Sequence, residues 1–340
     1  MRTRATLGTG LLVLVLAFAA FGAQAQASAV DVSLSFSNLA ELATDHYEGW
    51  LIIDGSPVST GKFVVNAAGE LEDLEGNQVS TFRVADVDLD LTTNFVLSIE
   101  PAVDPDPGPA AVKPLAGPLN VAKTSAALTP NLGVDLGSIS GQYILATPSD
   151  GPNTNEESGV WFLDPSGAEP AAGLVLPDLT TTDWEYEGWA VIQGTPVTTG
   201  KFDAPTPADK DNPYSGPLAT PPFPGEDFIQ GHPELTFPTN LQNQKIVISI
   251  EPRGTADTDP GPFQFKPLDG TVPAGALPGA LNSLTDKSST LATGTVEIAA
   301  VPPGVAVDMV LIGVAIAAVV AVIIIVVVIL IRRQGGQGSG

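Results

Sequence analysis

The sequence of 340 residues contains no cysteine, and this absence excludes several kinds of chemistry. Thiol nucleophiles, thiolate zinc sites and iron–sulfur clusters all need cysteine side chains. The two histidines, His46 and His232, lie far apart and show no metal-ligand spacing. A nucleophile elbow, a Walker loop and a dinucleotide fingerprint are also absent. We therefore predict that the protein is not an enzyme, and a hydrolase that uses carboxylates alone is the alternative left open.

Positive charge is also scarce. The chain has 14 Lys and Arg against 38 Asp and Glu, which gives a formal net charge of −24. A surface of this sign repels nucleic acids and anionic lipid head groups, so neither is an expected partner. With 44% hydrophobic and only 15% charged residues, the chain is too apolar to be a disordered acidic tail. The composition predicts folded domains with real cores.

The N-terminus has the three parts of a secretory signal. Arg2 and Arg4 form a charged start, and residues 11–21 form an apolar run that is too short to span a bilayer. Small-x-small cleavage patterns follow near residue 25. We predict a signal peptide at residues 1–25 and export of the chain that follows it.

A second apolar run, residues 309–331, contains 23 residues without a charge or a proline. As a helix it would be roughly 34 Å long, enough to cross a hydrocarbon core of about 30 Å. Arg332 and Arg333 follow it directly, and positive flanks mark the cytoplasmic side. We predict a transmembrane helix at 309–331 and a cytoplasmic tail at 332–340. The expected location is the cytoplasmic membrane, single-pass, with the N-terminal domains outside the cytoplasm.

The chain between these ends contains an internal repeat. Residues 47–63 match residues 186–202 at 12 of 17 positions with a constant offset of 139. Two further pairs of matched blocks follow in the same order: 95–101 with 246–252, and 106–117 with 259–270. Three matched blocks in one order indicate a duplicated domain.

The repeat units are expected to be built from β-strands. Apolar residues alternate in short segments, and frequent glycine (35) and proline (31) interrupt them. We predict an all-β fold of two tandem antiparallel β-sandwich domains, residues 30–150 and 158–300, joined by a polar connector. Between the first and second matched blocks the second copy is 12 residues longer and rich in proline. Such a loop is exposed and tolerant of change, so a binding function private to one copy is expected there.

The ordered blocks YEGW, PVSTGKF, SIEP, DPGP and KPL resemble the extracytoplasmic domain of the anti-sigma-K factor family. The resemblance covers nearly all of residues 31–300 and implies a β-rich fold outside the cytoplasm. The resemblance also implies a sigma-binding helical domain before the membrane span, whereas the tail that we expect inside, residues 332–340, has only nine residues. We therefore expect a membrane-anchored protein that binds an extracellular ligand or an envelope protein, or serves adhesion or envelope structure. The alternative is an anti-sigma-like ectodomain that senses envelope conditions through a partner or by proteolysis.

Close acidic residues in loops could bind calcium, which takes six to eight oxygen ligands. The strongest candidate is the set Asp209, Asp211 and Asn212 before Gly216. Asp104 with Asp106 and Asp257 with Asp259 are weaker candidates. Solvated turns explain the same residues without a metal, so no cofactor is expected other than this calcium.

The YEGW block supplies two further candidates. Trp50 and Trp189 would stack on sugar rings if exposed, or else fill the core. Glu48 and Glu187 occupy identical contexts in separate repeats, so we interpret them as equivalent structural positions and not as an acid–base pair.

Overall fold

The structure is a computed structural model that describes residues 29–257 and 260–302. Within these ranges the chain forms twenty strands and three short 3-10 helices. The predicted all-β fold is confirmed, with two large antiparallel sheets. No helix in the described part of the chain is long and apolar enough to cross a membrane. The predicted signal peptide (1–25), transmembrane helix (309–331) and tail (332–340) lie outside the described residues.

The first sheet has nine strands in the order β4-β3-β2-β6-β7-β8-β20-β1-β5, and neighbouring strands are antiparallel. Its strands are β1 (Val30–Ser37), β2 (His46–Ile53), β3 (Ser56–Val65), β4 (Leu71–Glu72), β5 (Thr81–Val84), β6 (Thr92–Glu100), β7 (Leu115–Pro118), β8 (Ser125–Pro130) and β20 (Thr293–Ala300).

The second sheet repeats this plan in the order β15-β14-β17-β18-β19-β9-β10-β16, with β13 also paired to β9. Its strands are β9 (Ser140–Leu145), β10 (Val160–Trp161), β13 (Leu174–Val175), β14 (Trp184–Ile192), β15 (Thr195–Phe202), β16 (Gly225–Glu226), β17 (Lys245–Pro252), β18 (Leu268–Thr271) and β19 (Asn282–Asp286). A small hairpin of β11 (Leu163–Asp164) and β12 (Ala171–Ala172) interrupts the strand that corresponds to β1.

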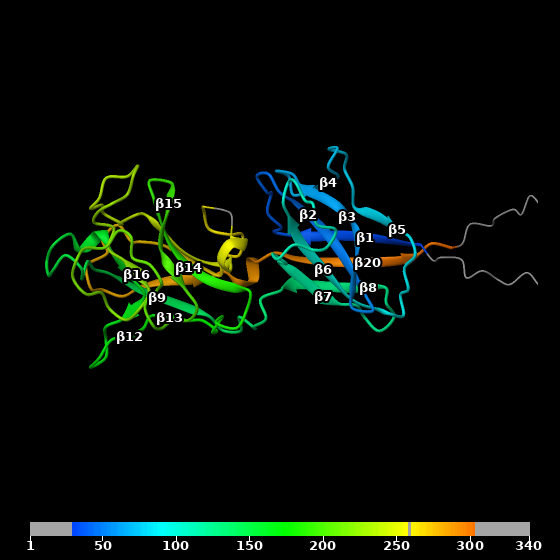
Figure 1. Cartoon of the computed structure of the whole chain (residues 1–340). Helices are drawn as coiled ribbons and strands as arrows, with labels where there is room; N and C mark the ends of the chain where they lie inside the picture. The colour runs from blue at the N-terminus through cyan, green and yellow to red at the C-terminus, as the bar shows by residue number, and fades with distance from the viewer. Residues whose placement is uncertain (1–28, 258–259, 303–340) are drawn as a thin grey trace, which may run out of the picture. The chain divides into compact units, whose positions relative to one another are not determined.

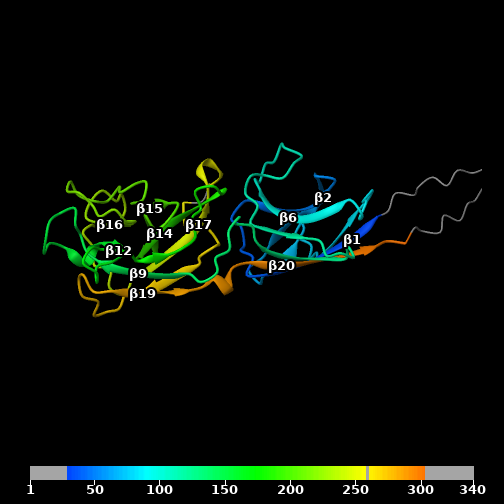
Figure 2. The same ribbon diagram turned by 90° about the horizontal axis from the view of Figure 1, so that it is seen from below.

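The two sheets exchange their last strands. β20, the final strand of the chain, lies between β8 and β1, where Val296 is opposite both Ala126 and Leu34. β9 belongs by sequence to the first repeat, yet it pairs with β19 and β10 of the second. Figure 1 shows β20 (orange) among the blue and cyan strands, and Figure 2 shows β9 (green) beside β19.

This exchange corrects the predicted division into residues 30–150 and 158–300. Each range contains one strand that completes the other sheet, so neither range forms its sheet alone. The prediction failed here because the last strands of the two repeats have the same pattern. Gly141 in β9 and Gly294 in β20 occupy matching registers, opposite Leu284 and Leu128 respectively.

The matched blocks begin with identical hairpins. Asp54 and Gly55 connect β2 to β3, and Gln193 and Gly194 connect β14 to β15. All four residues have positive φ, between 48° and 89°, which is the conformation of a type I′ turn. This turn matches the twist of the flanking strands, and it explains why glycine recurs at the second position.

Each sheet curls around its own aromatic core. In the first sheet Phe63 of β3 stacks on Tyr47 (5.6 Å) and also contacts Phe82 of β5 (6.1 Å). β3 and β5 lie near opposite ends of the strand order, so this contact requires a strongly curved sheet. In the second sheet Tyr186 stacks on Phe202 at 5.4 Å in the same way.

Candidate functional site

The repeated blocks build one buried polar cluster in each sheet, which we call the repeat cluster. In the first sheet it comprises Glu48, Trp50, Lys62, Ser98, Glu100 and Asp104. The Trp50 indole N–H donates to Ser98 Oγ at 2.7 Å, and the Ser98 hydroxyl donates to Glu100. Trp50 is 3% exposed, so its ring fills the interior and offers no face to a sugar.

Lys62 ties this cluster to the loop after β6. Its ammonium lies 3.4 Å from a Glu48 oxygen and 3.0 Å from Asp104 Oδ2. The backbone N–H of Ala110 donates to Glu100 Oε1 at 2.9 Å. The SIEP and DPGP blocks are therefore matched partners, because the first supplies the carboxylate and the second the loop that it holds.

The second repeat cluster has the same core with more charge. Trp189 donates to Ser249 at 2.7 Å, and Phe263 N–H donates to Glu251 at 2.9 Å. Lys201 lies within 3.7 Å of three carboxylates, those of Glu185, Glu187 and Asp257. Glu185 replaces His46 of the first copy and also pairs with Lys210 and Arg253.

Burial shifts two acids of the second cluster, Glu251 and Glu187, towards their neutral forms. Burial raises the pKa of Glu251 to about 7, although the hydrogen bond from Ser249 acts in the opposite direction. Burial also raises the pKa of Glu187 despite its contacts with Thr198 and Lys201. Glu251 Oε2 is buried and has no hydrogen-bond partner. A carboxylate in this position is costly when it ionises.

Glu251→Gln should therefore stabilise the protein at pH 8. The wild-type pKa is raised from 4.5 to about 7, so the stability from Glu251 is complete below about 4.5 and is lost as the pH rises through 7. Glutamine keeps the oxygen that accepts from Ser249 and Phe263 and removes the charge. We expect a gain of about 1–2 kcal/mol at pH 8 and none at pH 4.

Thermal unfolding of wild type, Glu251→Gln and Glu234→Gln between pH 4 and 8 checks this. Glu234 is exposed, so its variant reports the loss of one surface charge. If the unfolding temperatures of wild type and Glu251→Gln changed with pH in parallel, the raised pKa of the buried Glu251 would be contradicted.

The two copies of the cluster do not form a joint acid–base site. Glu48 and Glu187 lie in different sheets, each beside its own lysine, at equivalent positions as the sequence indicated. The lysine was not predicted as part of either cluster. The signal for it was present, because Lys62 and Lys201 recur at the same place in the two copies.

The predicted calcium residues lie in the loop between β15 and β17, residues 203–244, which we call the insert. Asp209 accepts hydrogen bonds from Asn212 (3.0 Å) and from Gly225 N–H (2.7 Å), and burial raises its pKa to about 7. Asp211 is exposed. Asp209 and Asn212 therefore bind each other through a hydrogen bond, and no group of three or more acids and histidines in the described residues has metal-site geometry.

The weaker acidic pairs take different roles. Asp104 and Asp257 each bind the lysine of their repeat cluster, and Asp259 lies outside the described residues. Their side chains therefore anchor loops. Calcium binding by the chain stays a prediction.

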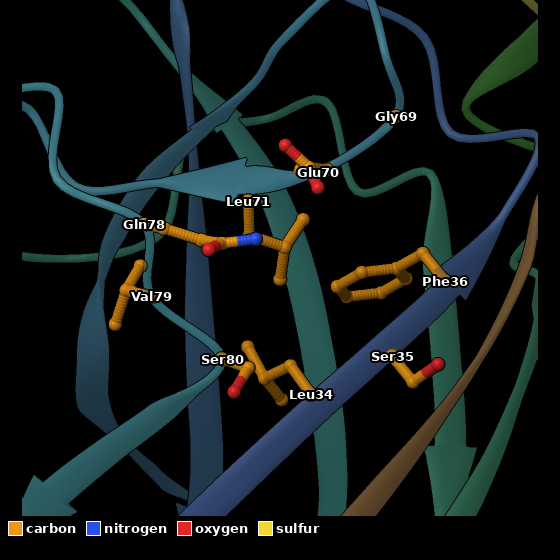
Figure 3. A pocket seen from close by; sticks show the side chains of 9 residues that line it. All are labelled: Leu34, Ser35, Phe36, Gly69, Glu70, Leu71, Gln78, Val79 and Ser80. Atoms are coloured by element: carbon orange, nitrogen blue, oxygen red, sulfur yellow. The ribbon is translucent and has the colours of Figure 1, made fainter.

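A small cavity of about 360 Å³ opens between β1 and β4 in the first sheet. Figure 3 shows Phe36 and Leu71 pointing into this space. The remaining lining residues are Leu34, Ser35, Gly69, Glu70, Gln78, Val79 and Ser80. Glu70 is the only ionisable side chain among them, so the cavity can admit a small apolar group but offers no acid–base pair. No local sequence pattern indicates this cavity, because residues of β1 and β4 that are far apart in the chain line it together.

The insert contains two buried acids that sequence reasoning missed, Glu226 and Asp227, both 0% exposed. Asp227 accepts from the Trp161 indole N–H at 2.7 Å and from Ser149 N–H at 2.8 Å. Glu226 accepts from Tyr214 N–H at 3.0 Å and from the Ser215 hydroxyl. The Asp227 bonds hold the insert against β10 and against Ser149 in the connector between the repeats, and the Glu226 bonds join parts of the insert to one another.

Comparisons of this chain with protein-family models, curated proteins and solved structures give no match. The resemblance to anti-sigma-K ectodomains therefore rests on the sequence blocks alone.

Proposed function

We propose that this chain is a membrane-anchored extracytoplasmic protein, built from two tandem β-sandwich modules, that works by binding, adhesion or envelope structure and not by catalysis. One observation carries the proposal. The repeated ionisable residues are bound to one another and to a loop backbone in both copies, which is the arrangement of a structural anchor. Both copies therefore keep the contacts that anchor this loop, whereas the insert is the part in which the second copy differs from the first.

The two ends of the described region lie side by side in the first sheet. Val301 N–H donates to Ala29 O at 2.9 Å, and β1 pairs with β20 along its whole length. Both ends of the described region therefore leave together from the first sheet. The second sheet carries no terminus of that region, so its insert is available to a partner.

Labelling of single cysteines in intact cells tests the location, because the natural chain has none. We expect a membrane-impermeant maleimide to label Ser166→Cys, on an exposed turn, without lysis. Gln337→Cys, in the predicted tail, should react only after lysis. The opposite labelling pattern would overturn the proposed topology. If the expected pattern is found, affinity capture with the labelled full chain would identify envelope partners.

The signalling alternative is favoured by the position of β20. This strand directly precedes the predicted span and is held between β8 and β1. A ligand that loosened the first sheet would free the strand attached to the anchor. Regulated proteolysis would appear as a ligand-dependent membrane fragment on immunoblots, which a purely structural protein would not produce.

A further inference from the structure

The insert presents a cluster of aromatic rings that the repeat clusters do not use. Tyr214 lies 5.5 Å from both His232 and Phe237, and these two rings are 5.4 Å apart. Beneath them Phe228 is fully buried and contacts Tyr214 at 6.1 Å. Tyr214, His232 and Phe237 are only half-buried. We call these three residues the aromatic platform.

The platform is held in place by buried polar contacts. The Glu226 carboxylate accepts from Tyr214 N–H at 3.0 Å, and Tyr214 O accepts from Ile229 N–H at 3.1 Å. Phe228 has φ of 46°, a left-handed conformation that is rare for a bulky residue and persists only where the surroundings impose it. Thr239 N–H, just after the platform, donates to the buried Ser158 at 2.9 Å. The rings are therefore fixed before any ligand arrives.

The imidazole of His232 is oriented by its own turn. Nδ1 accepts from the backbone N–H groups of Glu234 (3.1 Å) and Leu235 (2.9 Å). With Nδ1 as the acceptor, the neutral ring carries its hydrogen on Nε2. No described residue accepts that hydrogen bond. The platform thus combines three partly exposed aromatic rings with an unused donor on His232.

We propose that the aromatic platform binds the pyranose rings of a neutral glycan. The C–H face of a pyranose is weakly positive and stacks on the negative face of an aromatic ring, while its hydroxyl groups hydrogen-bond at the ring edges. His232 Nε2–H, the Tyr214 hydroxyl and the exposed Glu234 supply such edge groups. Trp50 and Trp189, the other candidates for stacking on sugar rings, are both buried.

Charge selects among glycans. The chain has a formal net charge of −24, and Lys210, the one basic residue of the insert apart from its histidine, is already paired with Glu185 and Asp203. An anionic polysaccharide would be repelled. A neutral glycan needs no counter-charge.

The first copy offers a natural comparison. Its shorter connection between the matched blocks contains one aromatic residue, Phe82, which packs on Phe63. The platform is therefore private to the second copy. The inference rests on the proposed binding function and names its ligand class.

Calorimetric titration of the full chain in detergent with hexasaccharides of glucose, mannose, N-acetylglucosamine and galacturonic acid tests the proposal. We expect binding of at least one neutral hexasaccharide and none of the galacturonate. His232→Asn keeps a side-chain oxygen to accept from the turn but removes the ring, and should weaken binding about tenfold. Leu218→Ala, an exposed change elsewhere in the insert, is the matched control and should bind like wild type.

Equal unfolding temperatures, within about 2 °C, would show that His232→Asn acts on binding and not on folding. Failure of all three neutral sugars to bind, preferential binding of galacturonate, or undiminished binding by His232→Asn would each overturn the inference. Cysteine labelling and partner capture do not depend on these glycan titrations. Failure of the glycan proposal can therefore be distinguished from failure of the proposed function.

Discussion

Val296→Asp should unfold the first sheet and leave the second sheet folded. Val296 is 0% exposed in β20, between Ala126 of β8 and Leu34 of β1. A carboxylate there would be buried without a partner, and we expect it to cost at least about 4 kcal/mol. β20 is the last strand of the second repeat in sequence, so a division into sequential domains would place the damage in the second sheet instead.

Hydrogen exchange measured by mass spectrometry separates the two outcomes. Amides of β2 and β6 should lose protection in Val296→Asp, while those of β14 and β17 keep it. Thr295→Asp changes the neighbouring exposed residue and should leave all four strands protected. Loss of protection confined to β14 and β17 would show that the strand exchange is wrong.

Local pattern was enough to predict the strands of the repeat and their covered faces. The large rings of Tyr47 and Trp50 lie on opposite faces of β2, a pattern that predicts a central strand. The strand is central, with β3 on one side and β6 on the other. Tyr47 packs in the core, and Trp50 lies under the loop that Glu100 holds. Alternation and turn chemistry are local properties, so one sequence reveals them.

The strand exchange could not be predicted in this way. β9 and β20 present the same small residue, Gly141 or Gly294, to a leucine of the neighbouring strand. Either strand therefore suits either sheet by pattern. The choice depends on the paths of residues 131–139 and 287–292, which connect the strands across the repeats. These long-range constraints leave no periodic signal in the sequence.

The candidate sites show the same limit. Close spacing of Asp209 and Asp211 predicts a shared metal, but spacing alone does not show that Asp209 accepts hydrogen bonds from Gly225 and Asn212. The aromatic platform combines Tyr214 with rings 18 and 23 positions further along the chain. Only the folded insert brings them together, although its extra length had marked it as the place to search.

Lys201→Met should be the most damaging change in either repeat cluster. Burial lowers the pKa of Lys201, but contacts with Asp257 and Glu187 outweigh it and raise the pKa above its usual value, so the ammonium stays charged. Its three carboxylate partners have side chains no more than 11% exposed. Removing the cation leaves Glu187 and Asp257 without their cationic partner, while Glu185 keeps Lys210 and Arg253. We expect a loss of about 3–5 kcal/mol at pH 7.

Two other lysines provide controls in denaturant unfolding. Lys62→Met, the same position in the first copy, removes the partner of two carboxylates and should cost less than Lys201→Met. Lys245→Met breaks an exposed pair with Asp269, which is worth at most about 1 kcal/mol. The deficit of Lys201→Met should also shrink as the pH falls from 8 to 5, because protonation removes the unpaired charges. A deficit that stayed constant over this range would mean that Lys201 stabilises the cluster by packing its alkyl chain and not by its charge.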